Sequence, residues 1–190
     1  MKHIIAVFLL GICFTASAQT VTSKIPPLDK SPMDMSYYPS DYPILKIQDK
    51  VTEPLVMRVI YSRPQLNGRK VFGGLQQYGD VWRLGANEAT EIDFYKDVIV
   101  NKVKINKGRY TLYAIPFPDK WTVIINKETD TWGSFRYDST KDVVRVSLPV
   151  NKNEVTEDMT ILFEKTASGA NMNMYWADVF VSLPIFFKND

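Results

Sequence analysis

The sequence predicts an all-β protein, an antiparallel β-sandwich or barrel in a single domain. Short segments in which apolar and polar residues alternate recur after residue 43, and turn-forming Gly, Pro, Asn and Asp residues separate them. No segment keeps a helical period for more than two turns, and no internal repeat is present. A length of 190 residues also fits one domain.

Residues 1–18 have the pattern of a secretory signal peptide. A lysine at the second position precedes an apolar run, and residues 16–18 (Ala-Ser-Ala) form a small-x-small cleavage site. The run is too short to anchor the chain in a bilayer. Lipidation at Cys13 requires a small residue before it, and Ile12 stands there. We therefore expect cleavage before Gln19 and a periplasmic or secreted protein without a lipid.

The composition of the expected mature chain excludes several kinds of chemistry. The only histidine and the only cysteine, His3 and Cys13, lie in the predicted signal peptide. Without them, disulfides, Cys-His and Ser-His-Asp nucleophiles and His- or Cys-based zinc sites are excluded. We expect no metal and no cofactor, since a calcium-loop motif is missing too. With 23 Lys and Arg against 21 Asp and Glu, nothing favours a nucleic-acid partner. No later apolar run is long enough for a membrane span.

Residues 19–43 are rich in proline, and we expect them to form an N-terminal extension before a sandwich domain of residues 44–190. Proline cannot donate to a strand ladder, so the extension is predicted to be a tether or an extended strip without a regular ladder. Its three tyrosines are expected to cover the surface of the domain; they are Tyr37, Tyr38 and Tyr42.

The predicted strands follow one another along the domain. Residues 55–61 alternate and have one wholly apolar face, and residues 89–95 alternate as well. Residues 103–105 and 109–115 flank an Asn-Lys-Gly turn, which predicts a hairpin with Gly108 in the left-handed conformation. Further strands are predicted at residues 121–125, 143–150, 159–163 and 174–183.

Polar and special residues gather between residues 61 and 90, with companions further on. The motifs are YSRP at 61–64, GR at 68–69, FGGL at 72–75, YGxVWRxGANEAT at 78–90, KGRYTLYAIP at 107–116, WTVIINK at 121–127 and TWG at 131–133. In these motifs the chain resembles a family of exported bacterial proteins, the unknown-function domain family 2911, over residues 54–150 and more weakly to residue 184. The resemblance implies a jelly-roll-like antiparallel β-sandwich, and it implies no activity or cofactor.

Seven residues of these motifs are candidates for ligand binding. Arginine forks, a side-chain amide and exposed tryptophan faces are groups that recognise carboxylates and polyols. The candidates are Arg63, Arg69, Trp82, Arg83, Asn87, Glu88 and Trp132. The other two tryptophans, Trp121 and Trp176, lie in strongly apolar segments and are predicted to be core. We therefore predict a binding module for a glycan, a small anionic ligand or a partner protein.

Strand alternation predicts that Arg63 and Glu88 form an ion pair at the mouth of the sandwich. When Ile92 and Phe94 point inward, a two-residue period also directs Glu88 inward. The same period directs Arg63 inward, because it lies two residues after the inward Tyr61. Two such charges should pair, since an isolated buried charge is costly. The pair either fastens loops over the open end of the sandwich or lines a pocket for an anion or a sugar.

Other interpretations stay open. A hydrolase would use Glu88 as one of two catalytic carboxylates, but the carboxylates of its own strand should point to the other face, so Asp80 or Asp138 would have to serve. Another interpretation is a purely structural envelope protein, which a covalent cross-link between a lysine and Asn87 could stabilise. Residues 138–140 are also similar to a short O-glycosylation motif of exported bacterial proteins.

Overall fold

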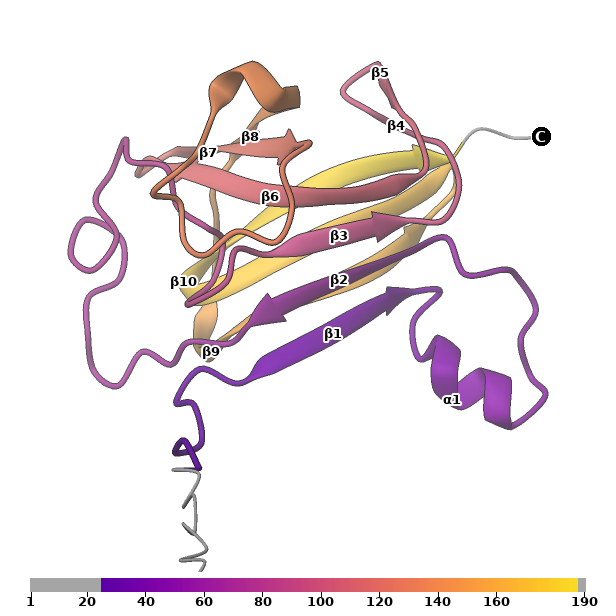
Figure 1. The fold of residues 1–190 in the computed structure, drawn as a ribbon, viewed down its shortest axis with the longest axis horizontal. Helices are drawn as coiled ribbons and strands as arrows, with labels where there is room; N and C mark the ends of the chain where they lie inside the picture. The colour runs from indigo at the N-terminus through magenta and orange to yellow at the C-terminus, as the bar shows by residue number, and fades with distance from the viewer. Residues whose placement is uncertain (1–24, 188–190) are drawn as a thin grey trace, which may run out of the picture.

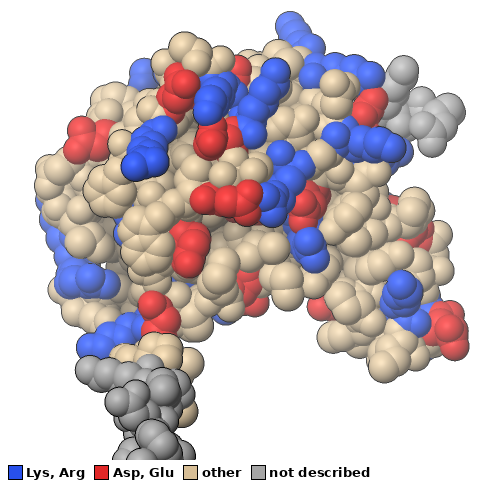
Figure 2. Space-filling model, in the orientation of Figure 1, with Lys and Arg blue, Asp and Glu red and all other residues tan. Residues whose placement is uncertain are grey.

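Two antiparallel β-sheets face each other across one core, and a loop lies over the outer face of the larger sheet (Figure 1). The computed structural model describes residues 25–187. The predicted signal peptide and its cleavage site lie outside the described residues. Basic and acidic side chains are interspersed over the face seen in Figure 2. No helix in the described part of the chain is long and apolar enough to cross a membrane.

The larger sheet has the strand order β1-β2-β3-β6-β7-β8 within the described residues, and the smaller sheet has the order β5-β4-β10-β9. The strands of the larger sheet are β1 (Met33–Tyr38), β2 (Met57–Ser62), β3 (Glu91–Phe94), β6 (Gly108–Pro116), β7 (Lys120–Asn126) and β8 (Asp142–Pro149). Those of the smaller sheet are β4 (Val98–Val100), β5 (Val103–Ile105), β9 (Asn151–Thr166) and β10 (Gly169–Phe187). All pairings are antiparallel, and the predicted single-domain β-sandwich is confirmed.

Helical structure in residues 25–187 is limited to two short pieces. Helix α1 (Tyr42–Ile47) follows β1, with Pro43 at its start, where its missing N–H is no loss. A single 3-10 turn, η1 (Ser139–Lys141), lies between β7 and β8, and Asp138 caps it. Neither piece exceeds two turns, in agreement with the sequence.

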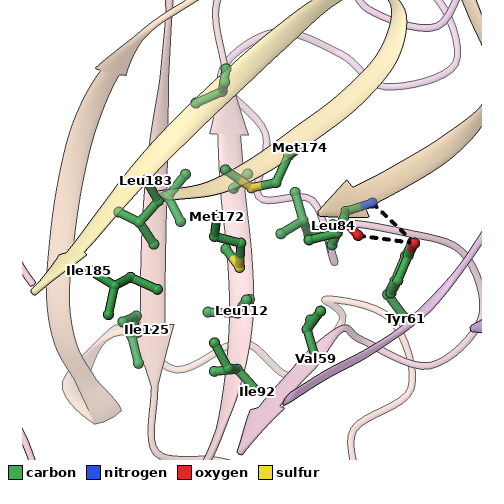
Figure 3. Packing of buried hydrophobic residues seen from close by; sticks show 14 of the residues in the cluster. Val59, Tyr61, Leu84, Ile92, Leu112, Ile125, Met172, Met174, Leu183 and Ile185 are labelled. Atoms are coloured by element: carbon green, nitrogen blue, oxygen red, sulfur yellow. Dashed lines mark hydrogen bonds between the residues drawn. The ribbon is translucent and has the colours of Figure 1, made fainter. Parts of the chain in front are cut away.

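The core is built by alternation in both sheets (Figure 3). In β2, Met57, Val59 and Tyr61 point inward and are buried, and in β3 Ile92 and Phe94 do the same. Strand β10 contributes side chains from the opposite sheet, namely Met172, Met174, Leu183 and Ile185. Burying one such side chain stabilises the fold by about 1.5–3 kcal/mol, so apolar packing holds the two sheets together.

The proline-rich extension supplies a strand of the larger sheet, so the prediction that it forms no ladder is wrong. Strand β1 pairs with β2 over its whole length, with Tyr38 opposite Met57. The prolines flank β1 instead of interrupting it, and at the edge of a sheet only one side of the backbone needs partners. Tyr38 is not a surface residue: it is buried against the rings of Phe163 and Phe187.

The predicted hairpin at Gly108 is also wrong, because β5 and β6 belong to different sheets. The hairpin joins β4 to β5, and its turn residues Asn101 and Lys102 have φ values of 48° and 65°. Two positive φ values are the signature of a type I′ turn, which matches the twist of the flanking strands. Gly108 has a φ of 149° and begins β6 opposite Phe94.

The last two strands are longer than predicted. The segments expected at residues 159–163 and 174–183 lie within β9 and β10, which together form one long hairpin. The register shifts at Ala177, which has a φ of 55°. Irregularities of this kind bend a strand, and they interrupt the alternation on which the sequence prediction depended.

Candidate functional site

The structure divides the seven candidate residues among three places. Arg63 lies at an edge between the two sheets. Arg69, Trp82 and Arg83 surround a cavity. Asn87, Glu88 and Trp132 lie near the outer face of the larger sheet.

Arg63 joins the two sheets at their edge. Its Nη1 lies 3.0 Å from the Oδ2 of Asp34 in β1, and its Nη2 donates to the Oγ1 of Thr160 in β9 at 2.9 Å. Its Nε donates to the backbone carbonyl of Met159 at 3.1 Å. Arg63 does point between the sheets, as predicted, but its partners come from β1 and β9.

The neighbours of Arg63 in the YSRP motif complete this contact. The hydroxyl of Tyr61 accepts from the backbone N–H of Ile161 at 3.1 Å and donates to its carbonyl at 3.4 Å (Figure 3). The carbonyl of Pro64 accepts from the N–H of Met159 at 3.0 Å. An open strand edge presents unpaired backbone groups, and here the motif satisfies them. The role of the motif is therefore to close the sandwich along β9.

The predicted ion pair between Arg63 and Glu88 is wrong. Glu88 is exposed, and it lies with Glu91 on the outer face of the larger sheet, where both line a cavity of about 200 Å³. The two-residue period fails before β3 begins, because Asn87 has a φ of 58° and Glu88 bridges to Trp132 in the β7–β8 loop. The expectation that Glu88 and Glu91 point to opposite faces fails for the same reason.

Arg69, Trp82 and Arg83 surround a cavity of about 270 Å³ beside the long β2–β3 connection. We call it the arginine cavity. Most of its lining comes from that connection, and β10 and the segment before β1 supply one residue each. The lining residues are Ser31, Pro64, Arg69, Leu75, Gln76, Trp82, Arg83, Gly85, Ala86 and Trp176.

The VWRLGANEAT stretch holds Arg83 in place through its backbone. Trp82 exchanges two backbone hydrogen bonds with Ala114 of β6, at 2.7 and 2.9 Å. The N–H of Thr90 donates to the carbonyl of Arg83 at 3.0 Å, and its hydroxyl donates to the carbonyl of Leu84 at 2.5 Å. Leu84 is buried with a φ of 53°, a conformation that is costly for a residue other than glycine. The backbone around Arg83 is therefore fixed before any ligand arrives.

Trp82 is a wall of the cavity and not an open stacking platform, which corrects the prediction. It is 3% exposed, and its ring stacks on Trp176 with centroids 5.7 Å apart and an interplanar angle of 18°. Trp121 meets it edge-on at 5.6 Å. Trp121 and Trp176 are buried, as predicted. The indole N–H of Trp82 donates to Gly85 at 3.0 Å, so its polar group is satisfied.

The Arg83 side chain is half-buried, and its buried Nε has no counter-ion among the described residues. Within residues 25–187, two buried side-chain polar atoms have no hydrogen-bond partner, the Oγ of Ser62 and the Nε of Arg83. Burial lowers the pKa of the Arg83 guanidinium. Among the described residues that line the cavity, none is a carboxylate. A charged donor that is buried without an acceptor destabilises the fold, and an anion is the kind of group that would satisfy it.

Arg69 brings a second positive charge to the same cavity. Its Nε donates to the carbonyl of Leu66 at 2.9 Å, and its Nη2 donates to the carbonyl of Gln65. These bonds orient the guanidinium but do not neutralise it, because carbonyl groups carry no net charge. Within the described part of the chain, neither Arg69 nor Arg83 forms an ion pair.

Asn87 fastens two loops instead of facing the cavity. Its Nδ2 donates to the Oδ2 of Asp29 at 3.0 Å, and its carbonyl accepts from the N–H of Gly133 at 2.9 Å. It thereby ties the segment before β1 and the β7–β8 loop to the same turn. These contacts give no support to a cross-link between Asn87 and a lysine.

The carboxylates near Glu88 have basic partners. Asp93 accepts from the Nε and Nη2 of Arg58 at 2.9 and 2.6 Å, and the Oε2 of Glu91 lies 3.4 Å from the Nε of Arg109. Among residues 25–187 no group of three or more His, Cys, Asp and Glu side chains is arranged to hold a metal ion.

Some residues of these sites carry no signal in the sequence. Asp34, the partner of Arg63, lies in a segment that was not expected to pair, and Trp176 reaches the arginine cavity from a strand 93 positions after Arg83. Only long-range pairing brings such residues together. The cluster of arginines at 69 and 83, by contrast, was visible in the motifs.

Comparison with known proteins finds one family. A family model described as "Protein of unknown function (DUF2911)" matches residues 43–185, and this supports the resemblance inferred from the motifs. No curated protein matches the chain, and no solved structure does.

Proposed function

The chain belongs to the family of proteins of unknown function DUF2911, and we propose that it is an exported binding module for a small anionic ligand. Arg83 and Arg69 hold the anion in the arginine cavity. The predicted signal peptide at residues 1–18 supports export, so the ligand is met in the periplasm or outside the cell.

One observation carries the proposal: the Nε of Arg83 is buried without an acceptor, in a cavity that no described carboxylate lines. A structural arginine normally has its acceptors within the protein, as Arg63 does. A carboxylate or phosphate oxygen would accept from Arg83 at about 2.7–2.9 Å. Binding would then relieve the desolvation cost that the free protein bears.

The cavity also limits the size of the ligand. At about 270 Å³ it lies near the lower end of the range of small-molecule sites, roughly 300–1,000 Å³. Trp82 and Trp176 form apolar walls beside the two arginines. The expected ligand is therefore a compact carboxylate or phosphate with an apolar part, and not a long polymer.

The test is a thermal-unfolding comparison of the purified mature chain in sodium phosphate, sulfate, succinate and benzoate, against sodium chloride at equal ionic strength. An anion at 100 times its Kd stabilises the folded state by about 2.7 kcal/mol. For a domain of this size that corresponds to a rise in Tm of about 5–10 °C. We expect at least one of the four anions to produce a saturable rise.

Arg83→Met removes the charge and keeps an apolar side chain, and it should abolish the rise without loss of stability in sodium chloride. The matched control is Lys50→Met, which removes one positive charge from an exposed position after α1. It should leave the rise intact. An equal rise in the Arg83→Met variant, or no rise with any of the four anions in the wild type, contradicts the proposal.

A carboxylate hydrolase is the alternative, and one observation favours it: Glu88 and Glu91 line the same small cavity on the outer face. Hydrolysis of a glycoside that is lost in Glu88→Gln and kept in Arg83→Met would select the hydrolase.

A further inference from the structure

The β7–β8 loop, residues 127–138, lies over the outer face of the larger sheet (Figure 1). Beneath it is a small second core. Its buried members are Ala89, Tyr113 and Ile124, with Val81, Ile115 and Tyr137 packed against them. The ring of Tyr137 meets Tyr113 edge-on, with centroids 5.1 Å apart. The loop is therefore packed onto the sheet and has apolar contacts of its own.

Hydrogen bonds fix the loop at several points. The carbonyl of Thr131 accepts from the N–H of Ala89 at 3.0 Å, and the N–H of Gly133 donates to Asn87 at 2.9 Å. The hydroxyl of Ser134 donates to the carbonyl of Val81 at 2.8 Å. A loop that is held in this way loses little conformational entropy when a ligand binds to it.

Two aromatic side chains of this packed loop nevertheless point into solvent. Trp132 is 60% exposed and Phe135 is 83% exposed, while the other three tryptophans are at most 3% exposed. Gly133 lies between them with a φ of 67°, and a Cβ there would come within 2.7 Å of the Phe135 ring. Glycine is thus needed for the conformation and for the position of the ring.

We propose that Trp132 and Phe135 form a platform that binds a saccharide. The two aromatics line a hollow of about 550 Å³, whose other walls are polar: Glu128, Thr129, Asp130, Thr131, Arg136, Asp138 and Lys141. Aromatic faces beside a few fixed hydrogen-bonding groups are the usual composition of sites for small polar ligands. The apolar face of a sugar ring packs on an aromatic ring, and its hydroxyls find donors and acceptors alongside.

The charges of the hollow favour a sugar over other occupants. Lys141 pairs with Glu128 and Arg109 pairs with Asp130, so neither sign dominates the surface around the aromatics. A small anion therefore prefers the arginine cavity, which shares no lining residue with this hollow. A protein interface would be poorer in Asp, Glu and Lys at its centre than this hollow is.

The exposed tryptophan provides a selective probe. Acrylamide should quench mainly Trp132, because the other three tryptophans are buried. We expect at least one of maltotriose, cellotriose, mannotriose, laminaritriose or chitotriose to reduce the acrylamide quenching constant at least twofold in a saturable manner. Titration calorimetry with that sugar should show at least a tenfold loss of affinity in Trp132→Ala and in Phe135→Ala.

Two control variants should bind the sugar as the wild type does. Phe117→Ala removes a partly exposed aromatic ring outside this loop. Arg83→Met removes the charge on which the proposed anion site depends, so this second control separates the two proposals. The proposal is overturned when none of the five sugars protects Trp132. It is equally overturned when a polypeptide, and no sugar, binds in a manner that requires Trp132.

Discussion

Arg63 and Arg83 are arginines from the same connection, and the protein treats their charges in opposite ways. Arg63 has an acceptor for each of its three nitrogens, including the carboxylate of Asp34. Arg83 keeps a buried nitrogen without any acceptor among the described residues. A hydrogen bond makes a net contribution of about 1 kcal/mol to the stability of a fold, whereas a buried charged donor without an acceptor destabilises it. Stability therefore explains Arg63 but does not explain Arg83, to which our proposal assigns the ligand.

This contrast predicts how two substitutions affect stability. Arg63→Met removes three hydrogen bonds and leaves the carbonyl of Met159 without its donor, so we expect a loss on the order of 1–3 kcal/mol in the free energy of unfolding. Glu88→Gln changes an exposed side chain and should change the free energy of unfolding by less than about 0.5 kcal/mol. Urea denaturation of the two variants measures both. A larger loss of stability in Glu88→Gln than in Arg63→Met would contradict this contrast and support the ion pair between Arg63 and Glu88.

Among the structural elements, the β4–β5 hairpin shows how a two-residue turn selects the pairing of strands. Asn101 and Lys102 both take positive φ values, and the turn they form places Val100 opposite Val103. Asparagine tolerates this conformation, but lysine pays a steric penalty in it. The hairpin that the sequence predicted one strand later, between β5 and β6, would have needed the left-handed conformation at Gly108, where the chain instead crosses to the other sheet.

Lys102→Gly should therefore stabilise the protein. Glycine relieves the strain at a φ of 65°, and part of that gain is offset because glycine makes the unfolded chain more flexible. We expect a net gain of about 0.5–1 kcal/mol in the free energy of unfolding, with an unchanged urea m-value. A destabilised variant would contradict the type I′ assignment. Lys104→Gly, within β5, should be destabilising and is the matched control.

At the scale of the whole molecule, the buried tyrosines make the free energy of unfolding decrease at alkaline pH. Burial, together with the hydrogen bond from its hydroxyl to Asp142, raises the pKa of Tyr137 from 10.0 to about 12. Burial also raises the pKa values of Tyr38, Tyr61, Tyr95 and Tyr110. Folding thus favours the protonated phenols. Their contribution is complete below pH 10 and is lost as the pH rises towards 12.

The midpoint of urea denaturation should accordingly fall between pH 10 and pH 12. Tyr137→Phe removes one of the groups that must ionise, so its midpoint should fall less steeply over that interval. Identical slopes for the variant and the wild type would show that the Tyr137 hydroxyl does not titrate differently in the folded and unfolded states.

The sequence predicts the sandwich well because the two-residue period is strong inside β2, β3 and β8, where one face of each strand is buried. It fails where the backbone leaves the extended conformation. The positive φ values of Asn87 and Ala177 end the alternation, and with it the inference about Glu88. The pairing of β1 with β2 joins distant segments, so the residues of β1 carry no local pattern that predicts it, and the prolines on either side of β1 suggest the opposite.

The candidate site was predicted in part for the same reasons. The arginines at 69 and 83 stand in motifs, and the structure places both at one cavity. Neither burial nor the lack of a counter-ion can be read from the motifs, because both depend on which segments fold against Arg83. The arginine cavity therefore emerges only when the β2–β3 connection is seen against Trp176 of β10.

The most direct test of the account is a nuclear magnetic resonance titration that follows the arginine Nε–Hε signals, with Arg83 assigned by its loss in Arg83→Met. A buried Nε–H exchanges slowly with water and should give a sharp signal. On titration with the anion that raises Tm most, the Arg83 signal should move downfield and saturate, while the Arg63 signal stays in place. Saturable binding that leaves the Arg83 signal unmoved would contradict the claim that this arginine holds the ligand.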